Sequence, residues 1–168
     1  MDRSDWFWLN VISPLERRYT DEFRNLGETL PIKIKHPYYL SKWWVNYQKQ
    51  NEFNPAHNHT GVYSFVIWMK IPYSWEEQTK LPQFQTTKIN DRKAGMFEFE
   101  YSDTRGETRS LSYQLSPEFE GCMCFFPAWM RHAVYPFFGT DEERVSISGN
   151  VWFTPGTSSS GKGFGKKK

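Results

Sequence analysis

Residues 121–134 read GCMCFFPAWMRHAV, and this stretch restricts the fold most strongly. An apolar run ends in Pro127, a short turn follows, and a second run begins with His132. Short apolar runs rich in aromatic residues and bounded by turn formers are typical of β-strands. The pattern therefore predicts two consecutive strands and places the imidazole of His132 at the mouth of a β-barrel.

The same alternation of short strands and turns continues on both sides of this stretch. The connections are rich in Pro, Gly, Asn and Asp, which is typical of a sandwich or jelly roll. The predicted strands are 32–36, 43–49, 62–70, 95–101, 107–114, 121–127, 132–137 and 144–153.

The N-terminal region changes its period after a first apolar segment. Residues 5–12, DWFWLNVI, alternate well enough to predict a strand. Ser13 to Glu16 form a capping box with proline at the first helical position, and apolar residues follow at helical spacing. We expect a helix over 14–26, packed on the outside of the sheet. The fold class is thus mainly β, with one or two flanking N-terminal helices.

The bulk composition indicates one domain. The chain has 168 residues, of which 38% are hydrophobic and 18% aromatic, so few but large rings are expected to fill the core. We expect a domain over 1–155 and a flexible basic tail over 156–168, where Gly, Ser and Lys dominate. No apolar run has the length of a membrane span, and a cytoplasmic location is expected.

The net charge of +2 comes from that tail. Four lysines lie in the last seven residues, so the rest of the chain has a net charge of −2 (+2 less 4). A slightly acidic body gives no electrostatic case for nucleic-acid binding. The oligomeric state is left open by the sequence.

Three of the four histidines form a candidate metal site. His57 and His59 are two residues apart among turn formers, so at the end of a strand both side chains share one face. Neutral imidazole is the commonest protein ligand for iron, zinc and copper. The pair alone is also compatible with two surface histidines in a loop, but His132 at the barrel mouth supplies a third ligand.

Arg144 begins the last predicted strand. Ser146, Ser148 and Asn150 share its face by period two, which gives an inward row that is polar where a core should be apolar. Gly149 interrupts the apolar face and marks a bulge or a close contact. A buried guanidinium needs an anion, which is either a nearby Glu or the carboxylate of a ligand.

These residues resemble the iron(II)- and 2-oxoglutarate-dependent dioxygenases, particularly the short, prolyl-hydroxylase-like members of bacteria and phages. The resemblance spans about 43–153, roughly two-thirds of the chain. It lies in the stretches WWVNYQKQNEFNPAHNHTGVYSFVIWM, GCMCFFPAWMRHAV and ERVSISGNV. It implies a double-stranded β-helix, or jelly roll, and a hydroxylase that converts 2-oxoglutarate to succinate and CO2.

The resemblance also implies roles for individual residues. His57, His59 and His132 take the Fe(II) positions, and Arg144 with Ser146 binds the distal carboxylate of 2-oxoglutarate. Further residues are implied more loosely. They are Asn46 or Tyr47 for the cosubstrate, and Ser64, Trp68 and Asn150 for the pocket wall.

His59 departs from the family pattern, which has Asp or Glu at this position. A third neutral ligand leaves the metal one unit more positive, which favours a dianionic cosubstrate but makes the iron less electron-rich. Two other functions stay open: a three-histidine dioxygenase that uses no 2-oxoglutarate, and a noncatalytic jelly roll whose aromatic residues stack on sugars or peptides. The polar loops at 71–94 and 101–107 are candidate lids, and the substrate, whether a protein side chain or a small molecule, is not predicted.

Overall fold

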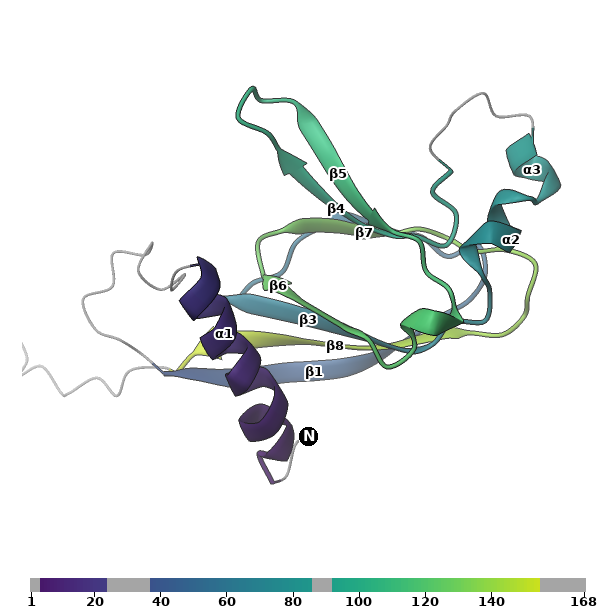
Figure 1. Ribbon diagram of the computed structural model, residues 1–168. Helices are drawn as coiled ribbons and strands as arrows, with labels where there is room; N and C mark the ends of the chain where they lie inside the picture. Colours follow the sequence, from purple (N-terminus) through teal and green to yellow (C-terminus); the bar gives the residue numbers. More distant parts are fainter. Residues whose placement is uncertain (1–3, 24–36, 86–91, 155–168) are drawn as a thin grey trace, which may run out of the picture.

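Two antiparallel sheets face each other in the computed structural model, which describes residues 4–23, 37–85 and 92–154 (Figure 1). One sheet has the strand order β1-β8-β3-β6 and the other β2-β7-β4-β5. The strands are β1 (Tyr38–Gln48), β2 (Asn54–His57), β3 (Tyr63–Lys70), β4 (Phe97–Ser102), β5 (Thr108–Tyr113), β6 (Met123–Pro127), β7 (Arg131–Val134) and β8 (Arg144–Phe153). The predicted mainly-β, jelly-roll class is confirmed.

Seven of the predicted strands correspond to described strands: 144–153 matches β8 at both ends, and the other six have shifted ends. β1 begins five residues before the predicted 43–49, because Tyr38 to Lys42 pair with the far end of β8 around a bulge. The sequence reading missed β2, a four-residue strand that contains a proline. Some expectations lie outside the described residues: the strand at 32–36, the last turn of the helix at 24–26 and the tail at 156–168.

The N-terminal prediction of a strand over 5–12 is wrong. Trp8–Ile12 form a π-helical turn that runs directly into α1 (Ser13–Phe23). Phe7 and Ile12, one π-turn apart, both pack against the first sheet: the Phe7 ring stacks on Trp43 at 5.1 Å, and Ile12 is fully buried. Packing against the sheet thus overrides the local alternation.

The predicted capping box is not used as a cap. The Ser13 N–H donates to the Trp8 carbonyl within a continuous helix, and Glu16 accepts a hydrogen bond from the Thr20 hydroxyl at 3.0 Å. The helix therefore begins before Ser13 rather than at Pro14.

The described parts of the connections between strands contain three short helices. They are α2 (Trp75–Thr79), α3 (Pro82–Gln85) and a 3-10 turn, η3 (Pro117–Phe119). Ser74 caps α2, since its hydroxyl accepts from the Glu77 N–H at 3.3 Å. Among the residues that the structure describes, none of the helices has the length and apolar character of a membrane span.

Strand alternation divides the apolar side chains into two cores. On β3, Val66 and Trp68 face the second sheet, and Tyr63 and Phe65 face the N-terminal helix. In Figure 1, α1 lies across the sheet that contains β3 and β8. The inner core lies between the sheets and supports the site described below, and the outer core fastens the helix to the first sheet.

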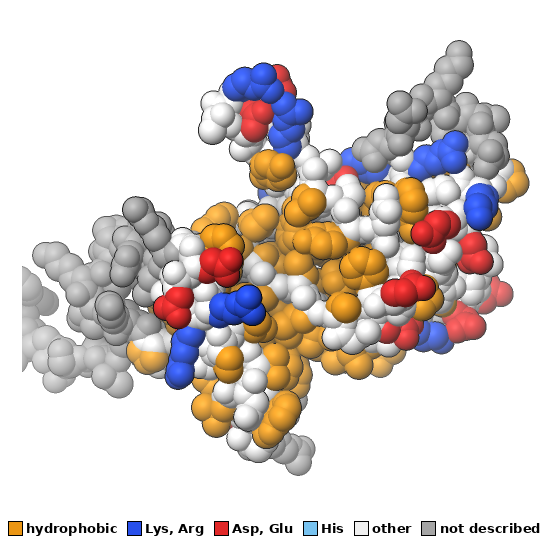
Figure 2. Space-filling model, in the orientation of Figure 1, with side chains coloured by type: hydrophobic (Ala, Val, Ile, Leu, Met, Phe, Trp, Pro, Cys, Tyr) orange, Lys and Arg blue, Asp and Glu red, His pale blue; other side chains and the backbone are white. Residues whose placement is uncertain are grey.

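The β4–β5 hairpin extends beyond the sandwich (Figure 1). Tyr101 and Leu111 are about half exposed on its inward face, and Figure 2 shows apolar side chains gathered between this hairpin and α1. The hairpin tip carries ion pairs among Arg105, Arg109 and Glu107. The aromatic residues predicted to fill the core thus also reach the surface.

Candidate metal centre

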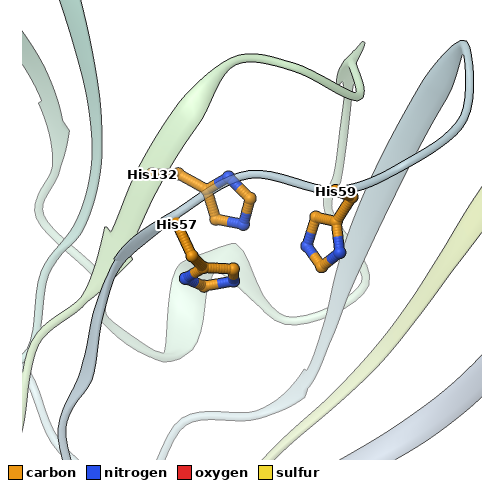
Figure 3. Close-up of side chains that lie close together, drawn as sticks. All are labelled: His57, His59 and His132. Carbon is orange, nitrogen blue, oxygen red and sulfur yellow. The ribbon is translucent and has the colours of Figure 1, made fainter.

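Three histidines converge between the two sheets (Figure 3). His57 ends β2 and lies opposite His132 of β7 in the antiparallel register. His59 follows in the loop after β2, where its backbone N–H donates to the Ala128 carbonyl at 2.8 Å. One cross-strand pair and one anchored loop residue therefore fix the three imidazoles.

The distances between these rings suit a common ligand. The candidate ligand nitrogens all lie within 4.8 Å of one another, and the ring centroids of His57 and His132 are 4.4 Å apart. His59 lies 5.1 Å from each of the other two. Protein ligands bind transition metals at roughly 2 Å, so small side-chain rotations bring three such nitrogens onto one ion.

Backbone carbonyls orient two of the rings. His57 Nδ1 lies 2.7 Å from the Pro55 carbonyl oxygen, and His132 Nδ1 lies 3.0 Å from that of Met130. A carbonyl can only accept, so Nδ1 carries the proton in both rings and Nε2 has a free lone pair. This is the arrangement in which metal-binding histidines are held by their second ring nitrogen.

The surroundings favour the neutral form of His59 and His132. Burial lowers the pKa of His132 to about 4 against the hydrogen bond to Met130, and His57 and His59 add to the shift. Burial, and then the neighbouring His57, also lowers the pKa of His59. The ring of Phe97 stacks on His132 at 5.4 Å. Neutral imidazoles offer lone pairs to a metal, and a set of three imidazole nitrogens suits Fe(II), Zn(II) and Cu(II) alike.

A cavity of about 500 Å³ opens in front of the histidines. Its floor is the β1–β8 pair, in which Trp44 lies opposite Ser148, Asn46 opposite Ser146 and Gln48 opposite Arg144. The remaining described lining residues are Tyr47, Glu52, Phe53, Asn54, His57, His59, Phe65, Val66, Trp68, Phe97, Phe126, His132 and Val134.

The two loops expected to form a lid contribute none of these described lining residues. Described residues of 71–94 instead form α2, α3 and their connections, and 103–107 form the tip of the β4–β5 hairpin. Glu52 and Phe53, which precede β2, and Asn54, its first residue, form part of the cavity wall and were not predicted to do so.

Arg144 lines the cavity with a buried guanidinium that is only 3% exposed. All its described hydrogen-bond partners are neutral: the Gln48 amide, the Tyr73 hydroxyl, and the Gly95 and Tyr135 carbonyls. Burial lowers the pKa of Arg144, and the charge interaction and hydrogen bond with Tyr73 oppose this shift. No Glu of the described residues pairs with Arg144, so its positive charge has no counter-ion among them.

The structure separates the two candidates on β1. The Asn46 amide donates to the Ser148 hydroxyl at 3.0 Å and to that of Ser146 at 3.4 Å, and its oxygen accepts from the Trp44 indole at 3.0 Å. Tyr47 also borders the cavity, but it alternates with Asn46 along β1 and its side chain is 63% exposed. Asn46 therefore lies beside Ser146, within the polar floor.

The three tentative pocket residues differ in position. Trp68 lines the cavity and is almost fully buried. Ser64 and Asn150 do not line it, which corrects the expectation: they lie opposite each other on β3 and β8, and the Ser64 hydroxyl donates to Asn150 Oδ1 at 2.8 Å. The inward row on β8 thus extends past the end of the cavity.

Trp44, Gln48 and Tyr73 are among the residues at this site that were not predicted. Trp44, whose ring centroid is 6.0 Å from that of His59, and Gln48 share the parity of Asn46, and this parity could have identified both. Tyr73 lies in the connection after β3 and meets Arg144 only through the tertiary fold. Its local sequence carries no signal for that contact.

Residues 42–150, more than half of the chain, match the model of a family described as "Putative 2OG-Fe(II) oxygenase". The matched segment contains the three histidines and Arg144. Among curated proteins, no sequence matches the chain.

Proposed function

The chain belongs to the 2OG-Fe(II) oxygenase family, and from this premise we propose that it is an Fe(II)- and 2-oxoglutarate-dependent hydroxylase. His57, His59 and His132 hold the iron, and Arg144 with Ser146 binds the distal carboxylate of 2-oxoglutarate. The observation that carries the proposal is the buried Arg144, which lines the same cavity as the histidines and has only neutral partners among the described residues.

The residues fit both groups. Two imidazoles have Nδ1 held by carbonyls and Nε2 free, and the third is fixed by its backbone, so the ligands are oriented before the metal arrives. Three neutral ligands leave the full charge of Fe(II). Together with Arg144 this charge makes the cavity attractive to a dianion such as 2-oxoglutarate.

When bound, Fe(II) with 2-oxoglutarate and O2 supplies the oxidation that hydroxylates a substrate C–H bond while 2-oxoglutarate becomes succinate and CO2. The chain positions the reactants and keeps water out. The guanidinium of Arg144 offers a fork of N–H donors to a carboxylate, and the Ser146 hydroxyl adds one donor beside it. Val66 and Phe126, from the same sheet as the polar floor, and Phe97, from the facing sheet, give the cavity its apolar walls.

The test is conversion of labelled 2-oxoglutarate to succinate by the iron-loaded protein in air. We expect slow formation of one succinate per 2-oxoglutarate consumed, even without a substrate. His132→Ala removes this activity because the metal is lost, and Arg144→Ala removes it because the cosubstrate is lost. The matched control is Arg109→Ala, which removes an exposed arginine at the hairpin tip and leaves turnover unchanged.

Two results would contradict the proposal. Iron-loaded protein that forms no succinate at any 2-oxoglutarate concentration favours a binding module or an oxygenase without this cosubstrate. Unchanged turnover in Arg144→Ala assigns the carboxylate to another residue.

A further inference from the structure

Gln48 occupies the edge of Arg144 to which a carboxylate would bind. Its side-chain oxygen Oε1 accepts from Arg144 Nε at 3.1 Å and also from Nη2. These two parallel N–H groups form the fork that binds carboxylates through both oxygens. A neutral amide thus fills the place of an anion.

The other N–H groups of Arg144 donate to partners that do not line the cavity. Nη1 donates to the Tyr73 hydroxyl and to the Gly95 carbonyl at 3.4 Å, and Nη2 also donates to the Tyr135 carbonyl at 3.2 Å. Gln48 and Arg144 line the cavity, whereas Tyr73, Gly95 and Tyr135 do not. A carboxylate that arrives through the cavity therefore meets Arg144 at the edge that Gln48 holds.

We propose that Gln48 is a placeholder for the cosubstrate carboxylate: it satisfies Arg144 in the free protein and gives way when 2-oxoglutarate binds. This inference rests on the proposed function. An unpartnered buried guanidinium is costly, so a resident acceptor stabilises the free state. A carboxylate displaces it because its full negative charge attracts the guanidinium more strongly than the dipole of a neutral amide does, and its two oxygens bind both N–H groups of the fork.

Gln48 can release Arg144 without losing all its partners. Its amide Nε2 donates to the Glu52 carbonyl at 2.6 Å, and the Glu52 carboxylate accepts from the Lys49 N–H at 2.8 Å. The side chain is therefore held at its nitrogen end by the turn before β2 when its oxygen moves. Gln48 acts as a positioning residue that sets the affinity for 2-oxoglutarate.

Two substitutions separate a placeholder from a direct ligand. Gln48→Ala empties the fork, so 2-oxoglutarate no longer has to displace an acceptor, and we expect roughly tenfold tighter binding from one hydrogen bond to a charged group. Gln48→Glu fills the fork with a permanent carboxylate and weakens binding by at least about tenfold. Gln50→Ala is the matched control, since that side chain bonds to Asp141 and Gly139 and does not line the cavity.

The measurement is calorimetric titration of each Fe(II)-loaded variant with 2-oxoglutarate without oxygen. Melting temperatures without ligand give a second readout: Gln48→Ala melts lower than the parent because Arg144 loses its acceptor, and Gln48→Glu melts at least as high. If Gln48→Ala does not fold, Gln48→Met, which also removes the amide oxygen but keeps the side-chain volume, replaces it: tighter binding of 2-oxoglutarate supports the placeholder role, and equal or weaker binding overturns it.

The outcomes separate this inference from the proposed function. If the parent binds 2-oxoglutarate and Gln48→Ala binds it equally or more weakly, Gln48 is a direct ligand or a bystander, and only the placeholder role is overturned. If neither the parent nor Gln48→Ala binds 2-oxoglutarate, the proposed function fails and the placeholder role fails with it. Binding by Gln48→Ala alone supports both.

Discussion

Gly149 in β8 provides a test of the packing that holds the floor of the site. An added Cβ would lie 2.6 and 2.7 Å from two ring atoms of Phe65 and 2.9 Å from Trp43 Cβ. Ordinary contacts are about an ångström longer. Phe65 is only 1% exposed, and Trp43 is stacked on Phe7, so neither ring can move aside freely.

Gly149→Ala is therefore expected to destabilise the protein. Relief of such overpacking by shifts of neighbouring groups costs about 1–3 kcal/mol. For a chain of this length, this corresponds to about 3–10 °C in Tm. The sign of the change in the free energy of unfolding distinguishes a crowded from an uncrowded position, because a glycine-to-alanine substitution in an uncrowded strand stabilises by about 0.5–1 kcal/mol.

The assay is urea unfolding of the parent, Gly149→Ala, Phe65→Leu and the double variant. The smaller side chain of Phe65→Leu gives the new methyl group room, so the alanine should cost about 1 kcal/mol less in that background. A stabilising Gly149→Ala, or an equal cost in both backgrounds, would refute the close packing of Gly149 against Phe65.

Two further predictions concern charge. His59→Asp introduces the carboxylate that the family usually has here and should keep stoichiometric iron, whereas His59→Ala should lose it. Metal analysis after gel filtration checks both variants. Full iron loading of His59→Ala would show that His59 is not a ligand. Burial raises the pKa of Glu98, but hydrogen bonds from Lys93 and Ser112 outweigh this effect and hold it below its usual 4.5. Because the pKa of Glu98 is lower in the folded than in the unfolded protein, ionised Glu98 stabilises the fold at pH values above the unfolded pKa. This stabilisation is lost as the pH falls through the folded pKa. Glu98→Gln should therefore lower the free energy of unfolding by about 2 kcal/mol at pH 7 and by progressively less below pH 4.5. Urea midpoints at pH 7 and pH 4 measure the difference, and a constant gap between parent and variant would contradict it.

The predictable part of the site follows from residue type and period two. Arg144, Ser146 and Ser148 share a parity, so their common face on the cavity was visible in the sequence. The convergence of His57, His59 and His132 was predictable because the first two share one face at the end of a strand and the third begins a strand at the mouth of the barrel.

The remaining features depend on tertiary neighbours. The segment 5–12 satisfies an alternating pattern, and only the packing of Phe7 and Ile12 against the sheet makes it helical. Gln48 is an ordinary polar residue, and its bond to Arg144 depends on the register between β1 and β8. Ser64 has the parity of a lining residue, but its position along β3 lies beyond the cavity.

The visible spectrum of the Fe(II) protein during titration with 2-oxoglutarate without oxygen tests whether one cavity holds Fe(II) on three histidines and 2-oxoglutarate at Arg144. We expect a weak charge-transfer band that saturates at one 2-oxoglutarate per iron and is absent in Arg144→Ala, which still binds iron. An iron-loaded parent protein that shows no band at saturating 2-oxoglutarate would contradict the claim.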